Sequence, residues 1–374
     1  MKIAIIGPAY PYRGGIAAFS ERLAREFQSE GHEVKLYTFT LQYPAFLFPG
    51  KTQYADGPAP ENLDIMRCIN STNPFHWRKV ACDLNRHQYQ VVIFAYWMSF
   101  FAPCYTAIAR GLKDAKCIAL VHNMIPHEKS LLDKLFAPRF VKTMDGFVTL
   151  SKSVLDDVTK LDRWQKPKTW SPHPVYDHFG AVEPREKALE RLGLDPQYRY
   201  LLFFGLVRAY KGLDWLLEAF ADERLRKYPL RLLVAGEFYD AKEPYLEIIR
   251  SHGLGEEVIV HDTFVPDHQV KDYFNAADIV VQPYKSATQS GVTQIAYHFG
   301  KPMLVTNIGG LEEIVPNGEV GYAVAPNVHD IADALVDFFE NDRFEPFKAN
   351  LLKRKELYSW PRLTEAISSL IMKC

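Results

Sequence analysis

Residues 2–39 read KIAIIGPAYPYRGGIAAFSERLAREFQSEGHEVKLYTF, and their pattern indicates the fold class. A short run rich in β-branched residues, 2–6, ends in a glycine-containing turn, and an amphipathic pattern with helical spacing follows over 16–30. A second apolar run covers 33–39. A strand, a helix and a second strand in this order predict a βαβ unit with parallel strands and a right-handed crossover.

The same alternation continues along the chain and then restarts. Further strands are expected in the first half at 91–96, 116–121 and 146–150, each followed by a helical pattern. Prolines and a charged run separate this half from a second series of strands, expected at 200–204, 230–235, 258–260, 279–282 and 303–306. Two α/β domains are therefore predicted, with a hinge near 172–198 and an amphipathic final helix over 360–373.

The composition is that of an ordinary globular chain. Its 374 residues are 48% hydrophobic and 24% charged, with a formal net charge of −1. Because a broad nucleic-acid surface needs a clear basic excess, such a partner is not expected, whereas a local phosphate pocket is compatible. The five cysteines form no CxxC pair, and no apolar run reaches about 18 residues, so we expect reduced thiols, a cytoplasmic protein and no transmembrane helix.

Two loops have features that suit an anion. The first follows the strand 2–6 and reads GPAYPYRGG over residues 7–15, so glycines meet the expected start of a helix. The second, residues 284–292, follows the strand 279–282 and brings small residues to another helix start. Backbone N–H groups and the helix dipole favour a negative group at such a place. A tight strand-to-helix turn without a ligand explains the first loop equally well.

Two cations lie just after the first strand of the second half, in the sequence Phe204-Gly205-Leu206-Val207-Arg208-Ala209-Tyr210-Lys211-Gly212. Arg208 and Lys211 would suit a diphosphate, whose charge must be neutralised as it leaves. Each is alternatively a solvated surface charge. No GxGxxG motif is present, which disfavours a dinucleotide dehydrogenase.

The motifs and their order through nearly the whole chain are similar to those of retaining glycosyltransferases of family 4. They are Gly14-Gly15, Val121-His122-Asn123, Gly205…Arg208…Lys211-Gly212, Ala277–Tyr284, Gly300-Lys301-Pro302 and Gly309–Glu313. The resemblance implies the α/β GT-B fold, in which two Rossmann-like domains face each other across a cleft. It also implies an acceptor-binding domain over 1–178, a nucleotide-sugar-binding domain over 179–358 and a helix over 359–374 that returns to the first domain.

The resemblance assigns roles to individual residues. The donor diphosphate would be held by Arg208 and Lys211, with backbone groups of Ser290, Gly291, Val292, Gly14 and Gly15. His122 would lie beside the transferred sugar, and Glu313 would hold its loop or a sugar hydroxyl. Glu237 and Val265 would line the nucleotide base and ribose. The family is metal-independent, so no metal site is expected. The sequence contains no Asp-x-Asp triplet, which agrees.

The chain departs from the family at two glutamates, whose positions are occupied by Ala287 and Ile295. Neither side chain can bind a sugar or ribose hydroxyl. The nearby amides of Gln289 and Gln294 can both donate and accept hydrogen bonds, so they are candidates to replace the glutamates. Because the phosphate cations are kept, this is interpreted as variation within the family.

His122 has two interpretations. A lone histidine at a strand end is commonly structural, but beside a phosphate site it is expected to hydrogen-bond a donor hydroxyl or to stabilise charge in the transition state. His127 and Glu128 would orient the acceptor or act as a general base, unless Glu128 only caps the next helix. Aromatic stretches at 41–50 and 96–101 suit a sugar face or a lipid chain of the acceptor.

The residues and the resemblance together predict an enzyme without metal or cofactor that moves a sugar from a UDP- or GDP-linked donor. The acceptor would be a glycan or a lipid-linked sugar, as in cell-surface polysaccharide biosynthesis, with peripheral contact at the inner face of the membrane left open. No catalytic nucleophile is found, so attack on the same face as the departing diphosphate is expected. A nucleotide-sugar epimerase and a non-catalytic nucleotide-binding partner subunit stay open as alternatives.

Overall fold

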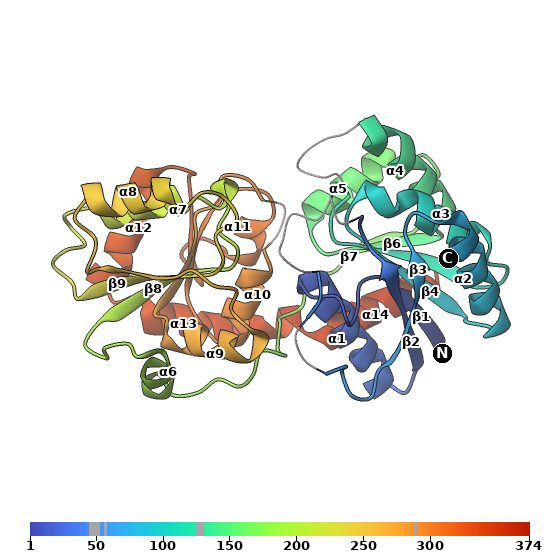
Figure 1. The fold of residues 1–374 in the computed structure, drawn as a ribbon, viewed down its shortest axis with the longest axis horizontal. Helices are drawn as coiled ribbons and strands as arrows, with labels where there is room; N and C mark the ends of the chain where they lie inside the picture. Colours follow the sequence, from blue (N-terminus) through green and yellow to red (C-terminus); the bar gives the residue numbers. More distant parts are fainter. Residues whose placement is uncertain (45–52, 56–57, 125–130, 288–289) are drawn as a thin grey trace. The chain divides into compact units, whose positions relative to one another are not determined.

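The computed structural model describes residues 1–44, 53–55, 58–124, 131–287 and 290–374. The chain forms two compact units, Met1–His173 with Trp360–Cys374, and Pro174–Ser359. Each unit is built on one parallel sheet covered by helices (Figure 1). In these ranges, no helix is both long enough and apolar enough to span a bilayer.

The first unit contains a seven-stranded sheet. Its strands are β1 (Lys2–Ile6), β2 (Glu33–Leu41), β3 (Asp64–Asn70), β4 (Val91–Tyr96), β5 (Lys116–Val121), β6 (Gly146–Thr149) and β7 (Lys168–Trp170). They lie in the order β3-β2-β1-β4-β5-β6-β7, and Ile3 of β1 pairs in parallel with both Val34 and Val91. The chain order reverses between β1 and β4, and ligands of open α/β sheets bind at such a switch point, at the carboxyl ends of the strands.

Helices cover both faces of this sheet, as the complete burial of β4 requires. They are α1 (Gly15–Ser29), α2 (Pro74–Arg86), the 3-10 turn η2 (Ser99–Phe101), α3 (Ala102–Arg110), α4 (Leu131–Thr143), α5 (Lys152–Leu161) and α14 (Trp360–Ile371). Side-chain caps set two of the starts. Asn73 accepts the N–H of Phe75 ahead of α2, and Ser151 accepts the N–H of Val154 ahead of α5.

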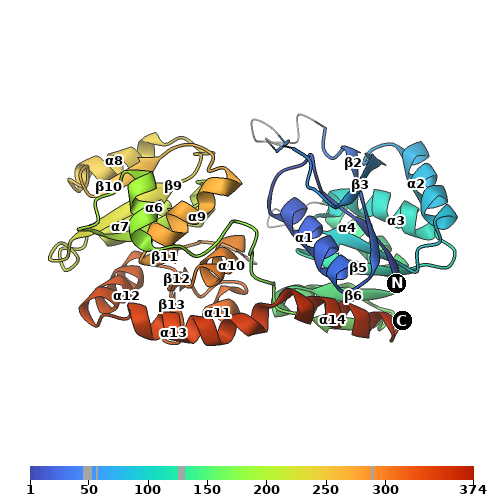
Figure 2. The same ribbon diagram turned by 90° about the horizontal axis from the view of Figure 1, so that it is seen from below.

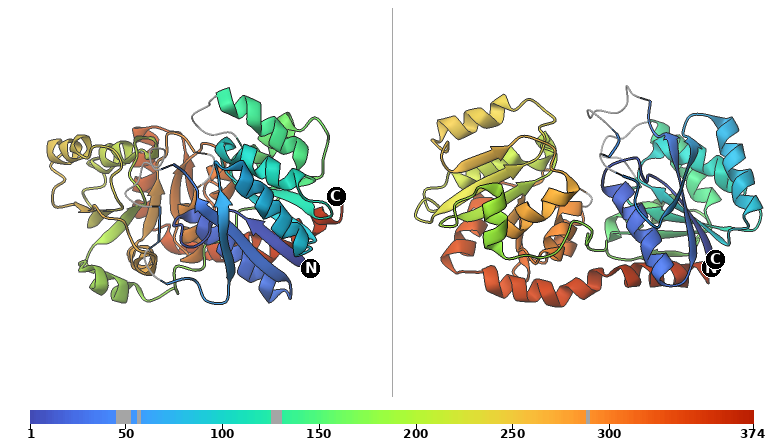
Figure 3. Two further views of the ribbon diagram at one scale, coloured as in Figure 1. Left: turned by 45° about the vertical axis from the view of Figure 1, so that its right-hand side comes forward. Right: turned by 60° about the horizontal axis from the view of Figure 1, so that its bottom comes forward.

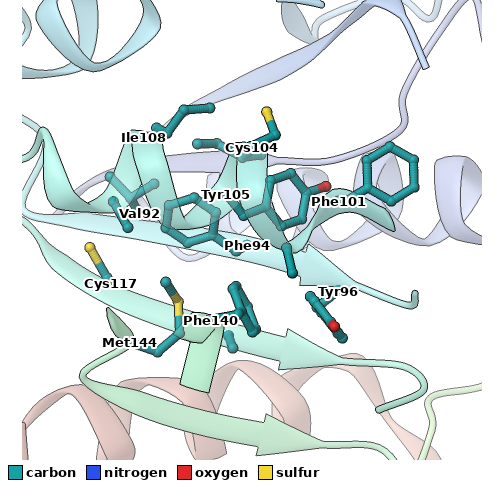
Figure 4. Close-up of a cluster of buried hydrophobic side chains, with 14 of the residues drawn as sticks. Val92, Phe94, Tyr96, Phe101, Cys104, Tyr105, Ile108, Cys117, Phe140 and Met144 are labelled. Carbon is teal, nitrogen blue, oxygen red and sulfur yellow. The ribbon is translucent and has the colours of Figure 1, made fainter. Parts of the chain in front are cut away.

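A buried aromatic cluster joins β4 to α3 and α4 (Figure 4). The ring centroids of Phe94 and Tyr105 are 5.5 Å apart, and Tyr96 stacks on Phe140 at 4.2 Å. All four side chains are buried. Because each such side chain contributes about 1.5–3 kcal/mol by leaving water, this cluster fixes α3 and α4 over the carboxyl half of β4.

The last helix, α14, belongs to the first unit although it follows the second in sequence (Figure 2). Trp360 of this helix is 2% exposed, and the centroid of its ring lies 4.9 Å from that of Phe19 in α1. The hydroxyl of Thr364 donates to the carboxylate of Glu30. The apolar side chains Leu363, Ile367 and Leu370 of this helix are buried, as its amphipathic pattern predicts. Figure 3 shows both chain ends on one side of this unit, where the Lys116 ammonium donates to the Cys374 carbonyl at 2.8 Å.

The second unit contains a six-stranded parallel sheet in the order β10-β9-β8-β11-β12-β13. Its strands are β8 (Arg199–Phe204), β9 (Leu230–Ala235), β10 (Val258–His261), β11 (Ile279–Gln282), β12 (Met303–Thr306) and β13 (Gly321–Val324). Its helices are α6 (Arg185–Leu192), η3 (Ala209–Lys211), α7 (Leu213–Phe220), α8 (Glu243–Ser251), α9 (Asp267–Ala276), α10 (Gly291–His298), α11 (Leu311–Ile314), α12 (Val328–Glu340), α13 (Phe344–Arg354) and η4 (Lys355–Tyr358). The switch point of this sheet lies between β8 and β11.

The predicted α/β fold with parallel sheets is confirmed, and every strand expected from the alternating pattern is present. The pattern misses three strands, β3, β7 and β13. β3 is an edge strand interrupted by the charged Arg67, and β7 is only three residues long. β13 is a four-residue edge strand that starts at Gly321. Such strands form because a neighbour offers hydrogen bonds, which a short or charged run does not reveal.

Candidate functional site

Two loops meet at the switch point of the second unit, one after β8 and one after β11. The Lys285 N–H donates to the Tyr210 carbonyl at 2.6 Å. Gly212 has φ 71°, and a Cβ there would lie 1.9 Å from the Pro283 carbonyl oxygen. Only glycine allows this approach together with a left-handed backbone. The loop carrying Arg208 and Lys211 is thus fixed against the loop that leads to α10.

Arg208 and Lys211 are partly buried at this switch point, and within the described residues neither forms an ion pair with a carboxylate. The Arg208 guanidinium lies 4.0 Å from the centroid of the Tyr239 ring, and the Arg208 Nε is buried without a hydrogen-bond acceptor in the described part of the chain. The Lys211 ammonium lies 5.7 Å from the Tyr284 ring centroid. Burial, with the nearby Arg208 charge, lowers the pKa of Lys211 to about 8. Two neighbouring cations without an acidic partner among the described residues would suit a bound anion.

The start of α10 borders the same loop. Ser290 is its N-cap, and its Oγ accepts the Val292 N–H at 3.2 Å and lies 3.3 Å from the Tyr284 hydroxyl. A Cβ on Gly291 would lie 2.8 Å from the Tyr176 ring, so this glycine allows a close approach. The Val292 N–H already donates to the Ser290 side chain. The predicted contact between this N–H and the donor diphosphate therefore requires the bond to Ser290 to break.

The other predicted donor residues of this unit follow β9 and β10 or lie on α10 and α11. Glu237 follows β9, and its carbonyl accepts the Val207 N–H at 2.9 Å, which places it beside the Arg208 loop. Val265 follows β10 and is buried, whereas Glu313 is exposed on α11. Gln294 is fully buried on α10, with no partner for either amide atom among the described residues. Gln289 lies outside the described residues.

Sequence reasoning missed two features of this site. Tyr239, which stacks on Arg208, gives no signal except its place two residues after Glu237. Gln282 ends β11 with 1% exposure, and neither of its amide atoms has a partner in the described ranges. A glutamine at the end of an otherwise apolar strand, Ile279–Gln282, was the available signal.

In the first unit, the Gly14-Gly15 pair lies at the start of α1, after β1. Gly14 is the N-cap with φ 114° and supplies no side-chain cap, and both glycines are exposed. The N-terminal turn of a helix carries the positive end of the helix dipole, which favours a negative group nearby. The predicted anion loop thus has the expected position, at the carboxyl end of a switch-point strand.

His122 follows β5 and packs its ring edge-on against Phe19 of α1, with 4.8 Å between centroids. Its Nε2 is buried, with no hydrogen-bond partner among the residues described. Burial, with the neighbouring His173, lowers the pKa of His122 to about 3. His122 is therefore neutral at physiological pH and suited to hydrogen bonding. His173, which also packs on Phe19 at 5.0 Å, was not identified from the sequence.

The proposed acceptor residues His127 and Glu128 lie outside the described residues. The aromatic stretches do meet: Trp97 donates its indole N–H to the Tyr43 hydroxyl at 3.0 Å, and lies 4.2 Å from Phe101 between ring centroids. Among the described residues, no three His, Cys, Asp or Glu side chains gather as metal ligands.

Comparisons with known protein families agree with this geometry. Residues 198–341 match the family described as "Glycosyl transferases group 1", and residues 13–172 match "Glycosyltransferase Family 4". A D-inositol 3-phosphate glycosyltransferase of Pseudarthrobacter chlorophenolicus is 31% identical, over 88% of this chain and 82% of its own. An uncharacterised glycosyltransferase of Methanocaldococcus jannaschii is 23% identical, over 98% of this chain and 96% of its own.

Solved structures show the same fold. HepE of Anabaena, in complex with UDP and glucose, superposes with a TM-score of 0.77 at 14% identity and full coverage of both chains. Sucrose-phosphate synthase of Thermosynechococcus elongatus gives a TM-score of 0.76 at 16% identity, with 99% of this chain and 98% of that chain covered. The fold is therefore GT-B, and the chain belongs to the group 1, family 4 glycosyltransferases.

Proposed function

We propose that this glycosyltransferase uses a nucleoside-diphosphate sugar and transfers the sugar with retention of configuration, without a metal ion or cofactor. The observation that carries the proposal is the pair Arg208 and Lys211, two partly buried cations without an ion-paired carboxylate among the described residues. A diphosphate supplies the missing negative charge. Preorganised cations at the leaving group stabilise the charge that develops there as the bond to the sugar breaks.

The donor is proposed to be a UDP- or GDP-sugar bound by the second unit. The neighbour HepE was solved with UDP and with UDP-glucose, which supports a nucleotide-sugar donor. Glu237 and Val265 follow neighbouring strands, β9 and β10, where a base and a ribose would extend from the diphosphate. Gln294 is fully buried and has no hydrogen-bond partner in the described ranges. Of the two amides that could replace a family glutamate, it is the one that the structure describes.

The first unit is proposed to bind the acceptor and to supply His122. As a neutral ring with an unpartnered Nε2 among the described residues, His122 is suited to hydrogen-bond a hydroxyl of the transferred sugar. Retention is proposed to follow from attack on the face that the diphosphate leaves, because no nucleophile was identified. The departing diphosphate then accepts the acceptor's proton.

The acceptor is proposed to be a glycan or a lipid-linked sugar in cell-surface polysaccharide biosynthesis, in the cytoplasm or peripherally at the inner face of the membrane. The cluster of Tyr43, Trp97 and Phe101 supports an acceptor with an apolar face. Relatives named as inositol phosphate glycosyltransferases support a hydroxyl-bearing acceptor, with a sugar transferred to oxygen.

The test is to incubate the purified protein with UDP- and GDP-sugars and a metal chelator, with and without lipid-linked saccharide primers. Nucleotide release with a primer, and an unchanged anomeric configuration in the product by NMR, would support the proposal. Conversion of the donor without any primer would indicate an epimerase. Tight donor binding without turnover would indicate a non-catalytic subunit, and a trapped covalent glycosyl-enzyme would exclude same-face attack.

A further inference from the structure

One face of α2 is turned to solvent and has an unusual composition. Its exposed side chains recur every three or four residues and line a shallow hollow of about 450 Å³ together with Asp83; they are Phe75, Arg78, Lys79, Cys82 and Arg86. Phe75 is 80% exposed, one of the two most exposed large hydrophobic side chains in the described chain. The opposite side of the helix is held by buried Val80 and Leu84.

The C-terminal end of α3 adds further cations beside this helix. Figure 2 shows α2 and α3 close together, and the Asn85 amide of α2 donates to the Gly111 carbonyl at 2.7 Å. The Lys113 N–H donates to the Asn85 side-chain oxygen at 3.1 Å. The exposed Arg110 and Lys113 therefore extend the surface. We call this surface the basic face, comprising Phe75, Arg78, Lys79, Cys82, Arg86, Arg110 and Lys113.

The five cations of the basic face have no ion-pair partner within the described residues. The nearby Asp83 is engaged elsewhere, because it accepts the Tyr37 hydroxyl at 2.8 Å and lies 3.5 Å from His87 Nδ1. The whole chain has a net charge of only −1, so this is a local excess. By contrast, Arg354 on the exposed helix α13 lies 2.7 Å from Glu319.

We propose that the basic face docks on an anionic lipid bilayer. Phe75 enters the headgroup region, and the cations lie against lipid phosphates. An aromatic side chain beside lysines and arginines on one helix face is the combination that interfacial membrane helices use. A soluble polyanion would be attracted by the cations but would leave Phe75 without a partner. The biological purpose of this docking rests on the lipid-linked acceptor of the proposed function. The test measures membrane binding and needs no enzymatic turnover.

The chain supplies a natural probe, because Cys82 lies within the basic face and is exposed. The other thiols are less accessible, and burial raises the pKa of Cys68 and Cys117 to about 12. An environment-sensitive fluorophore on Cys82 is mixed with vesicles of phosphatidylglycerol and phosphatidylcholine, or of phosphatidylcholine alone. A blue shift only with the anionic vesicles, reversed by high salt, is the expected result.

Binding is then compared between variants by vesicle co-sedimentation. Arg78→Glu with Lys79→Glu should lower partitioning about tenfold or more, and Phe75→Ser should lower it several-fold. The matched control is Leu352→Ser with Lys353→Glu on α13, where Leu352 is 56% exposed, and it should bind as wild type.

Equal binding of all variants, or equal binding to neutral vesicles, would overturn the proposal. So would a Cys82 response that needs a soluble polyanion or a second copy of the chain instead of lipid. Nucleotide-induced stabilisation of the same variants is measured in parallel. Because the diphosphate cations Arg208 and Lys211 lie in the other unit, the nucleotide-induced stabilisation should be unchanged in these variants. Its absence in every protein would count against the donor site alone.

Discussion

Replacing Lys211 by methionine should stabilise the protein without ligand while removing its donor site. Methionine keeps the length and packing of the side chain but not its charge. Burial and the nearby Arg208 charge lower the pKa of Lys211 to about 8, from the ordinary lysine value of 10.5. Since each pKa unit corresponds to about 1.4 kcal/mol, the charged side chain costs the folded state up to about 3 kcal/mol. Part of Lys211 still contacts solvent, so this figure is an upper limit.

The lowered pKa of Lys211 also determines how the stability difference between the variant and the wild type changes with pH. Below pH 8, Lys211 is charged in both the folded and the unfolded protein, and its full cost opposes folding. Between pH 8 and 10.5 it loses its proton in the folded state first, so the cost disappears as the pH rises. The free energy of unfolding, measured by urea denaturation, should therefore favour Lys211→Met at pH 7, and this advantage should shrink above pH 8.

The matched control for this experiment is Lys285→Met. Lys285 lies on the neighbouring loop but forms a 2.5 Å ion pair with Asp214, so removing it should not stabilise the protein. A Lys211→Met protein that is less stable than wild type at pH 7, or whose difference from wild type does not change with pH, would refute the reasoning.

Four further outcomes are expected. Nucleoside-diphosphate affinity, followed by calorimetry, should fall in the wild type as the pH rises above 8, by at most about tenfold per unit, because binding requires the charged form of Lys211. Gly212→Ala should lower the free energy of unfolding by at least about 2 kcal/mol, since its Cβ would lie 1.9 Å from a carbonyl oxygen. Trp360→Ala should cost about 3–5 kcal/mol by the same assay, because it leaves a cavity against Phe19. His122→Phe should lower kcat with little change in Tm, and the wild-type kcat should show no titration of His122 between pH 5 and 8, since the pKa of His122 is about 3.

Much of the fold can be predicted from the sequence, because strands buried on both faces appear as continuous apolar runs. The run Val91–Tyr96 is an example, and it is the wholly buried centre of the first sheet. The run Asp64–Asn70 is not recognisable in this way, because it is an edge strand with charged positions facing solvent. The place of α14 on the first unit was expected from a family resemblance, since its amphipathic pattern alone does not say which core it covers.

The candidate site could be predicted only in part. Spacing after a strand identified Arg208 and Lys211, but whether a cation has a carboxylate partner depends on residues distant in sequence. Tyr239 and His173 were missed for the same reason, because each acts through a ring that contacts a residue 31 or more positions away. The cations of α2 were not recognised from the sequence, because their shared exposed face becomes clear only from the burial of the opposite side of the helix.

The most direct test of the account is calorimetric titration of UDP and GDP, without added metal, into wild type, Arg208→Gln, Lys211→Met and Lys285→Met. We predict that one nucleotide binds wild type and Lys285→Met alike, and binds Arg208→Gln and Lys211→Met at least about tenfold more weakly. Equal binding to all four proteins, or binding to none, would contradict the assignment of Arg208 and Lys211 to the donor diphosphate.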